Sequence, residues 1–206
     1  MTRYAIAVDL DRCIGCEGCM IACKNENNVP LGQKWNTVLK IGPYGTYPHL
    51  KQYFLPIMCQ QCENAPCVNV CPTGASYRDP KTNVVLVNKE KCIGCKSCMM
   101  ACPYGVRNWN ADERVVEKCT LCSQHLKEGE EPLCVSACCG SARFFGDVDD
   151  PNSDISKALA AKPDAVHKLH DAGNHPVTSY ILSSKYAEWH DTFTTPTYAR
   201  YSGFEE

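Results

Sequence analysis

Short strand-like runs separated by cysteine-rich turns dominate the pattern of hydrophobic and polar positions along the chain. The longest apolar runs, 4–8 and 84–87, have the length of single strands. Three further strand-like pieces, 75–78, 106–109 and 141–145, each follow a turn that closes a cysteine group. Short strands that alternate with turns predict an α+β fold.

The segment that follows residue 147 carries no cysteine motif. Ser153 or Asp154 can cap a short helix that Pro163 ends, and 177–182 alternates like a strand. The stretch 186–204 is polar and rich in aromatic residues. Because this segment has too little apolar periodicity to fold alone, we expect it to lie across a partner subunit or back over the rest of the chain.

Two polar stretches are assigned plain surface roles. We expect 123–132 to form an inserted polar loop that is solvated rather than a docking site for a partner. His167 and His170 are expected on one face of a helix that ends near Gly173. No histidine is predicted to be a metal ligand, because a plain exposed helix face explains the spacing better than a metal site does.

Composition and charge exclude several classes of function. The 206 residues include 21 basic and 23 acidic side chains, and this balance argues against a nucleic-acid partner. No apolar run approaches the roughly 18 residues that cross a bilayer, so no direct membrane span is expected. The first residues do not have the pattern of a secretory signal, and neither nucleotide-binding glycine motif occurs.

Cysteine is the most informative residue type in the composition. The chain has 17 cysteines, a number that indicates a cysteine-built scaffold, so we expect ligand bonds rather than a large apolar core to organise the fold. Sixteen of them fall into four quartets. The quartets are Cys13, Cys16, Cys19 and Cys23; Cys59, Cys62, Cys67 and Cys71; Cys92, Cys95, Cys98 and Cys102; and Cys119, Cys122, Cys134 and Cys138.

The spacing inside the quartets favours iron-sulfur clusters over zinc and disulfides. The first and third quartets read CxxCxxCxxxC, the run with which bacterial ferredoxins hold 4Fe-4S clusters. Three thiolates in so short a loop can hold three irons of one cubane, and the fourth cysteine serves a neighbouring cluster. Zinc usually takes two CxxC pairs separated by a spacer, and a disulfide framework fits poorly with an odd count of closely spaced cysteines. No CxxCH haem motif occurs.

An internal repeat indicates how the quartets pair. Residues 7–16 match 86–95 position by position in the kind of residue, so a strand that leads into a cysteine loop occurs twice. The short gap from Cys71 to Cys92 suits a two-cluster ferredoxin, which pairs the second quartet with the third and leaves the first to pair with the fourth. A sequential pairing, first with second and third with fourth, is the alternative.

The nested pairing predicts four ligand sets and three segments. The sets are Cys13, Cys16, Cys19 and Cys138; Cys23, Cys119, Cys122 and Cys134; Cys59, Cys62, Cys67 and Cys102; and Cys71, Cys92, Cys95 and Cys98. Two ferredoxin-like modules result, one from 1–50 with 111–147 and one from 51–110 enclosed within it. An extended C-terminal segment, 148–206, is expected to contact a partner.

The quartets in this order resemble the iron-sulfur subunit of dimethyl sulfoxide reductase-type molybdopterin oxidoreductases. The second reads CxxCxxxxCxxxCP, the third CxxCxxCxxxCPYG, and the fourth is widened by an insertion; the resemblance covers 5–150. It implies a non-catalytic electron-transfer subunit with four 4Fe-4S clusters, docked on a molybdenum or tungsten bis-pterin catalytic subunit. A membrane anchor that exchanges electrons with quinone, or a soluble donor, completes the expected complex. The subunit would work in the cytoplasm or be exported folded with a partner that bears a twin-arginine signal.

Other redox complexes contain subunits with similar iron-sulfur clusters. An electron-transfer subunit of a formate dehydrogenase or hydrogenase, or a free polyferredoxin, would have similar cysteine runs. These functions differ in the partner subunit, and the sequence of this chain does not identify that partner.

Two positions depart from the repeated pattern. Cys139 stands where a ferredoxin run usually has proline, so the ligand in the fourth quartet could be Cys138 or Cys139. The spacing favours Cys138, and we expect Cys139 to be a small buried thiol. Glu17 in the first quartet corresponds to Lys96 in the third, which predicts opposite shifts of the potentials of the two clusters.

Overall fold

The structure is a computed structural model that describes residues 2–190, and the expected partner-contacting segment therefore lies partly outside the described residues. The strands are β1 (Tyr4–Asp9), β2 (Thr37–Tyr44), β3 (Lys51–Ile57), β4 (Ser76–Arg78), β5 (Val85–Val87), β6 (Asn108–Asn110), β7 (Val115–Glu117), β8 (Arg143–Asp147), β9 (Val166–His167) and β10 (Ser179–Ile181). The helices are α1 (Gly18–Glu26), α2 (Pro66–Asn69), α3 (Ser97–Met100), α4 (Ser123–Glu128), α5 (Leu133–Ser136) and α6 (Asp154–Ala161), followed by the 3-10 turn η1 (Pro163–Ala165).

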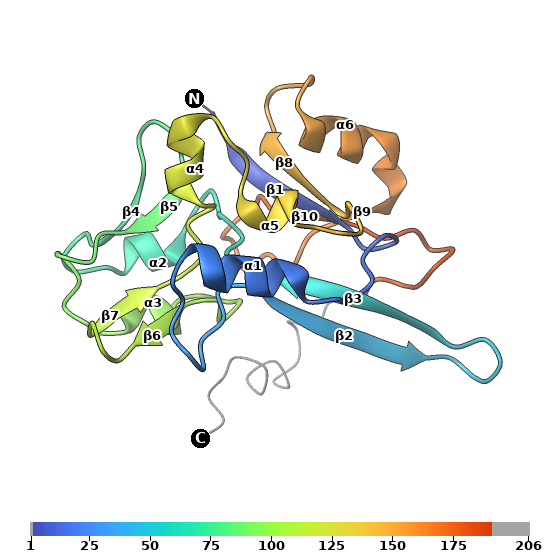
Figure 1. Ribbon diagram of the computed structural model, residues 1–206, viewed down its shortest axis with the longest axis horizontal. Helices are drawn as coiled ribbons and strands as arrows, with labels where there is room; N and C mark the ends of the chain where they lie inside the picture. The colour runs from blue at the N-terminus through green and yellow to red at the C-terminus, as the bar shows by residue number, and fades with distance from the viewer. Residues whose placement is uncertain (1, 191–206) are drawn as a thin grey trace.

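A four-stranded sheet in the order β8-β1-β10-β9 forms the upper layer of the molecule (Figure 1). β1 runs antiparallel to β8 and parallel to β10, so it is the buried centre of the sheet. Ile6 and Val8 on one face join the main core, while Ala5 and Ala7 on the other face pack with Ile155 of α6. A strand covered on both faces needs a continuous apolar run, which explains why residues 4–8 are apolar without alternating polar positions.

Three two-stranded sheets make up the rest of the strand structure in the described residues. β2 and β3 form a long hairpin that projects from the molecule in Figure 1, with Leu39 opposite Leu55 at its buried end. β4 pairs with β5, and β6 pairs with β7. The expected strands near 75–78, 84–87 and 106–109 are confirmed within two residues at each end. The hairpin 37–57 was not predicted from the sequence.

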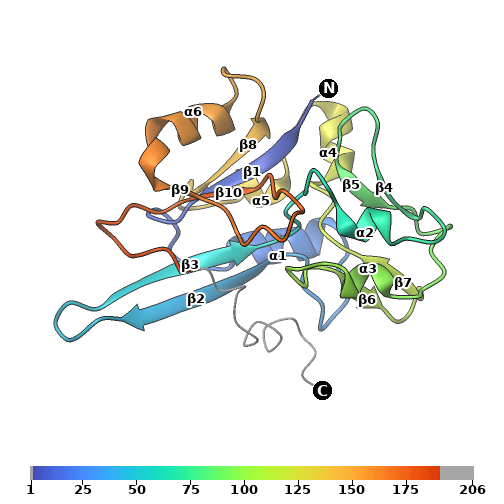
Figure 2. The ribbon, with the colours of Figure 1, turned by 180° about the vertical axis from the view of Figure 1, so that it is seen from behind.

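The segment after β8 packs against the sheet and crosses the back of the molecule (Figure 2). Ser153 caps α6 by accepting a hydrogen bond from the backbone N–H of Ser156 at 3.2 Å, and η1 starts at Pro163, so this helix is confirmed. The prediction of a helix around His167 and His170 is wrong. His167 lies in β9 opposite Tyr180, because the turn at Pro163 redirects the chain into backbone pairing with β10.

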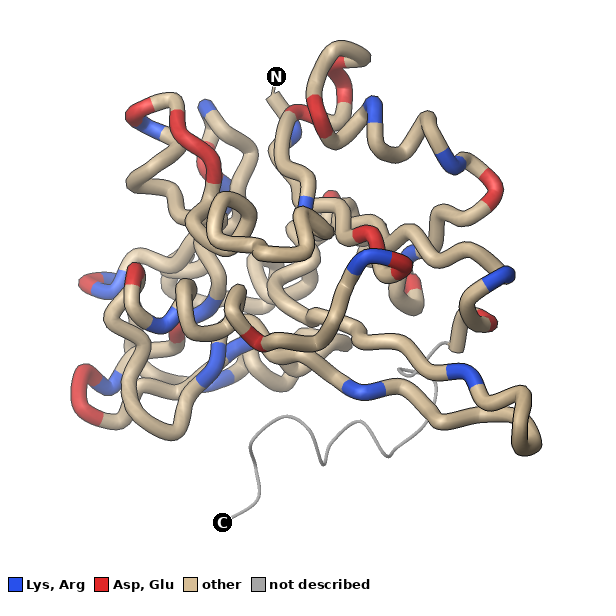
Figure 3. The backbone as a smooth tube through the Cα atoms, turned by 45° about the vertical axis from the view of Figure 1, so that its right-hand side comes forward, with Lys and Arg blue, Asp and Glu red and all other residues tan. Residues whose placement is uncertain are grey.

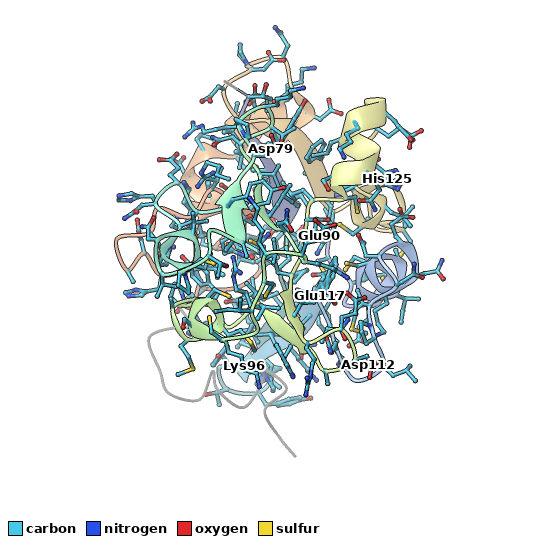
Figure 4. All side chains as sticks on the ribbon, turned by 90° about the vertical axis from the view of Figure 1, so that its left-hand side faces the viewer. Asp79, Glu90, Lys96, Asp112, Glu117 and His125 are labelled. Carbon is cyan, nitrogen blue, oxygen red and sulfur yellow. The ribbon has the colours of Figure 1, made fainter. Side chains whose placement is uncertain are left out.

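The insertion expected to be a polar loop is partly helical. Its α4 lies against α1, and His125 bridges the two by contacting Glu26 at 2.7 Å through Nε2 and Glu130 at 2.9 Å through Nδ1 (His125 is labelled in Figure 4). The hydrogen bonds to Glu26 and then to Glu130 raise the pKa of His125. This long-range contact orders a segment whose composition alone resembles a loop.

Basic and acidic residues are interspersed over the traced chain (Figure 3). Within 2–190, no helix is both long enough and apolar enough to cross a membrane.

Candidate metal centres

The loops of the first and third quartets have the same backbone conformation. Gly15 and Gly94 have φ of 67° and 69°, and Glu17 and Lys96 follow with φ of 59° and 60°. A Cβ on Gly15 would lie 2.4 Å from the ring of Phe54, so the loop needs glycine for space as well as for its backbone angle. The repeat seen in the sequence is therefore also a repeat in structure. The first loop leads into α1, which carries Cys19 and Cys23, and the third leads into the shorter α3, which carries Cys98.

Three of the predicted ligand sets each line one cavity. These spaces are free of protein atoms, partly open to solvent and similar in size, at about 380, 340 and 330 Å³. The first is lined by Cys13, Cys16, Cys19 and Cys138, the second by Cys59, Cys62, Cys67 and Cys102, and the third by Cys71, Cys92, Cys95 and Cys98. Within the described residues, no three His, Cys, Asp or Glu side chains are arranged to hold a single metal ion. Four thiols around a small cavity do fit a cubane cluster.

The fourth predicted set gathers where α1, α4 and α5 meet. Burial raises the pKa of Cys23, and the neighbouring thiols Cys119, Cys134 and Cys122 raise it further. The side-chain amide of Asn27 bridges the set by donating to Cys23 Sγ at 3.8 Å and to Cys122 Sγ at 3.9 Å. The structure thus brings together the members of all four sets, and their ligation of iron stays a prediction.

The four sets are arranged in a row. Arg143 lines the cavity of the Cys13 set and donates to Cys134 Sγ of the Cys23 set at 3.2 Å. Lys118 lines the cavity of the Cys59 set and directly precedes Cys119 of the Cys23 set. Ser76 lines the cavity of the Cys71 set and accepts a hydrogen bond at 2.8 Å from Arg107, which lines the cavity of the Cys59 set. The row therefore runs from the set of Cys13 through those of Cys23 and Cys59 to that of Cys71.

Cys139 is exposed, and the expectation of a buried thiol is wrong. It occupies the turn after the last cysteine of its quartet, where the second and third quartets have Pro72 and Pro103, and this corner points outward. Its Sγ lies 3.5 Å from Cys16 Sγ, whereas Cys138 lines the cavity.

One contact to a cluster thiol comes from the C-terminal segment. Asn174 is 2% exposed, and its Nδ2 donates to Cys62 Sγ at 3.0 Å and to the hydroxyl of Tyr104 at 2.7 Å. Burial raises the pKa of Cys62 to about 12, and the hydrogen bond from Asn174 opposes that rise. Sequence reasoning missed Asn174, because no motif surrounds it and the contact spans 112 residues.

Sixteen thiols in four sets, carried by loops with ferredoxin spacing, define an iron-sulfur protein. The family of 4Fe-4S dicluster domains matches residues 50–148, and a 4Fe-4S binding domain matches 10–27. A Halobacterium salinarum protein named as a dimethyl sulfoxide reductase iron-sulfur subunit is 44% identical over 88% of this chain and 79% of its own length.

Two further relatives cover most of the chain. Protein NrfC of Escherichia coli is 43% identical over 90% of this chain and 83% of its own length. A sulfite dehydrogenase subunit of Allochromatium vinosum is 39% identical over 90% of this chain and 85% of its own length. The chain belongs to the family of 4Fe-4S electron-transfer subunits of oxidoreductases that these relatives represent. The resemblance inferred from the cysteine motifs is confirmed.

Proposed function

We propose that the chain holds four 4Fe-4S clusters and passes electrons through them one at a time, as the non-catalytic subunit of a molybdopterin oxidoreductase complex. The observation that carries this proposal is the row of four thiol sets, each with four members gathered around one place. Four clusters held in this row would form a path along which electrons pass from one cluster to the next.

Each set supplies the ligands of one cluster in this proposal. Cys138 completes the first set and Cys102 the third, so each fourth cysteine crosses to the neighbouring cluster. The clusters of Cys59 and Cys71 form the enclosed module 51–110, and those of Cys13 and Cys23 form the enclosing module from 1–50 and 111–147. The pairing of β1 with β8 supports the enclosing module, because β1 leads into the first quartet and β8 follows the fourth.

The proposed partner is a catalytic subunit with a molybdenum or tungsten pterin site. Such a site exchanges two electrons with its substrate, whereas each cubane carries one electron. The row therefore converts a two-electron reaction into successive one-electron transfers. A membrane anchor or a soluble donor would exchange electrons at the other end, and segment 148–206 would contribute to partner contact. Two more relatives, named as an arsenate respiratory reductase iron-sulfur subunit and a tetrathionate reductase subunit, support a role in a reductase complex.

Anaerobic purification with metal analysis tests the proposal. We expect four irons and four sulfides for each of the four clusters, and molybdenum or tungsten in the co-purifying subunit. Cys98→Ser should convert or remove one cluster, while the matched control Cys139→Ser should retain all four. A protein that is pale and iron-free, that contains zinc, or whose cysteines are paired as disulfides would refute the proposal.

A further inference from the structure

Two buried arginines occupy the same position in the two modules. Arg107 lies five residues after Cys102, and Arg143 lies five residues after Cys138. Arg107 is 3% exposed and Arg143 is 5% exposed. The shared spacing is a sequence signal that comparison of the quartets could have found.

Arg143 lies between the first two sets of the row. Its Nη1 donates to Cys134 Sγ at 3.2 Å, and its side chain also lines the cavity of the Cys13 set. Burial lowers the pKa of Arg143, but the neighbouring thiols Cys134 and Cys19 outweigh burial and raise it. The guanidinium therefore faces one thiol set on each side.

Arg107 lies between the last two sets. It lines the cavity of the Cys59 set, and its Nη2 donates to Ser76 Oγ at 2.8 Å. Ser76 in turn lines the cavity of the Cys71 set, so the guanidinium of Arg107 lies between the two cavities. Its Nη1 is buried and has no hydrogen-bond partner within the described residues.

Lys118 occupies the remaining gap. It is 2% exposed, lines the cavity of the Cys59 set and directly precedes Cys119 of the neighbouring set. Its Nζ donates to the carbonyl oxygens of Val85 and, at 2.8 Å, of Cys119. The Nζ can make three such bonds, so capacity remains toward the cavity.

Within the described residues, these three cations have no carboxylate partner. No ion pair found in 2–190 includes Arg107, Lys118 or Arg143, although surface residues of the same region form several. A buried charge without a counter-charge is costly, so such groups normally occur beside an opposite charge. Cysteine thiolates around an iron-sulfur cluster supply that charge, and an added electron makes each cluster more negative still.

We propose that each gap between neighbouring clusters holds one buried cation, Arg143, Lys118 and Arg107 in order along the row, and that each cation raises the reduction potential of both clusters it separates. This inference rests on the proposed function and extends it to named residues that are not themselves predicted ligands. An arginine stays charged at any working pH, so an electron can be added beside it without an accompanying proton.

Redox titration monitored by EPR tests the proposal on the holoprotein. In Arg107→Met, the reduced-to-oxidised ratio at a fixed potential should fall at least tenfold for two clusters, a shift of about 59 mV for a one-electron couple. Arg143→Met should shift the other two clusters, and Lys118→Met should shift one cluster from each pair. The test compares which EPR signals shift together in each variant, so it does not require that each signal first be assigned to a particular cluster. Arg107→Lys, and Arg114→Gln at an exposed position, are the controls and should leave the reduced-to-oxidised ratio of all four clusters within twofold of the wild-type value.

The possible outcomes separate this inference from the proposed function. Four intact clusters with unchanged midpoints in Arg107→Met and Arg143→Met would overturn the inference alone, as would shifts of the same pair in both variants. If Arg107→Met loses clusters, their recovery in Arg107→Lys would support the role of charge, and their loss in that variant too would overturn it. A wild-type protein without clusters would refute the proposed function instead.

Discussion

Replacing Asn174 with leucine should lower the reduction potential of one cluster, that of the Cys59 set. The side chain is buried, and its amide donates to Cys62 Sγ at 3.0 Å and to Tyr104 at 2.7 Å. Leucine has a similar size but no donor, so the thiolate loses a hydrogen bond that stabilises its negative charge. A cluster gains negative charge when it is reduced, and the loss therefore disfavours the reduced state.

The structure sets the scale of this effect. A hydrogen bond to a charged group contributes about 1.5–3 kcal/mol, and only the difference between the two oxidation states moves the potential. If that difference is about 1 kcal/mol, the midpoint should fall by about 40 mV, because 1.4 kcal/mol corresponds to about 59 mV for one electron. Asn174→Asp should produce a larger fall, since a carboxylate replaces the donor while its oxygen can still accept the backbone N–H of Ala172, now at 3.0 Å.

Potentiometric titration of the purified holoprotein, with each cluster followed by EPR, measures the shift. Asn152→Leu is the matched control, because Asn152 is exposed and should leave every midpoint unchanged. Iron content must equal that of the wild type, which shows that the substitution has not cost a cluster. A fall of less than about 10 mV, or about equal shifts in all four clusters, would refute the reasoning that this single bond tunes its own cluster.

Three further predictions follow from the cysteine loops and from α4. Cys138→Ser should lose or convert one cluster and Cys139→Ser should keep all four, as measured by iron content and EPR spin counts; equal losses would contradict the assignment. Glu17→Lys should raise the midpoint of one cluster and Lys96→Glu should lower that of another, each by roughly 20 to 40 mV for an exposed charge, and unchanged midpoints would count against it. The raised pKa of His125 means that its protonated form is favoured in the fold, so its stabilisation is complete below about pH 6.5 and is lost as the pH rises through the higher folded-state pKa. The Tm difference between wild type and His125→Gln should therefore shrink from pH 5.5 to pH 9, and a constant difference would refute the ion-pair explanation.

Several features of the fold follow from local sequence. The run 4–8 is apolar at every position because β1 is covered on both faces, and Ser153 caps α6 because its hydroxyl meets a backbone N–H within the first turn. The cysteine loops are equally local, since Gly15 and Gly94 adopt the backbone angles that the close spacing requires. Such features depend on residues a few positions apart, so their spacing is enough to predict them.

Other features depend on contacts between distant residues. The polar insertion becomes α4 through His125 and its carboxylate partners, and Cys139 is exposed because of the corner that follows its quartet. The segment around His167 forms a strand because β10 offers it backbone partners. Composition and periodicity carry no information on these neighbours.

The sequence by itself determined which thiols are candidates for clusters and how they group within each loop, because the spacing of the thiols limits the kind of metal group that a loop can bind. Only the tertiary structure decided what surrounds those thiols. Asn174 reaches Cys62 from across the chain, and Arg107, Lys118 and Arg143 lie buried in the gaps between sets. These groups have a strong influence on a cluster because burial removes the water that would otherwise screen their charge, and burial is a property of the packed fold.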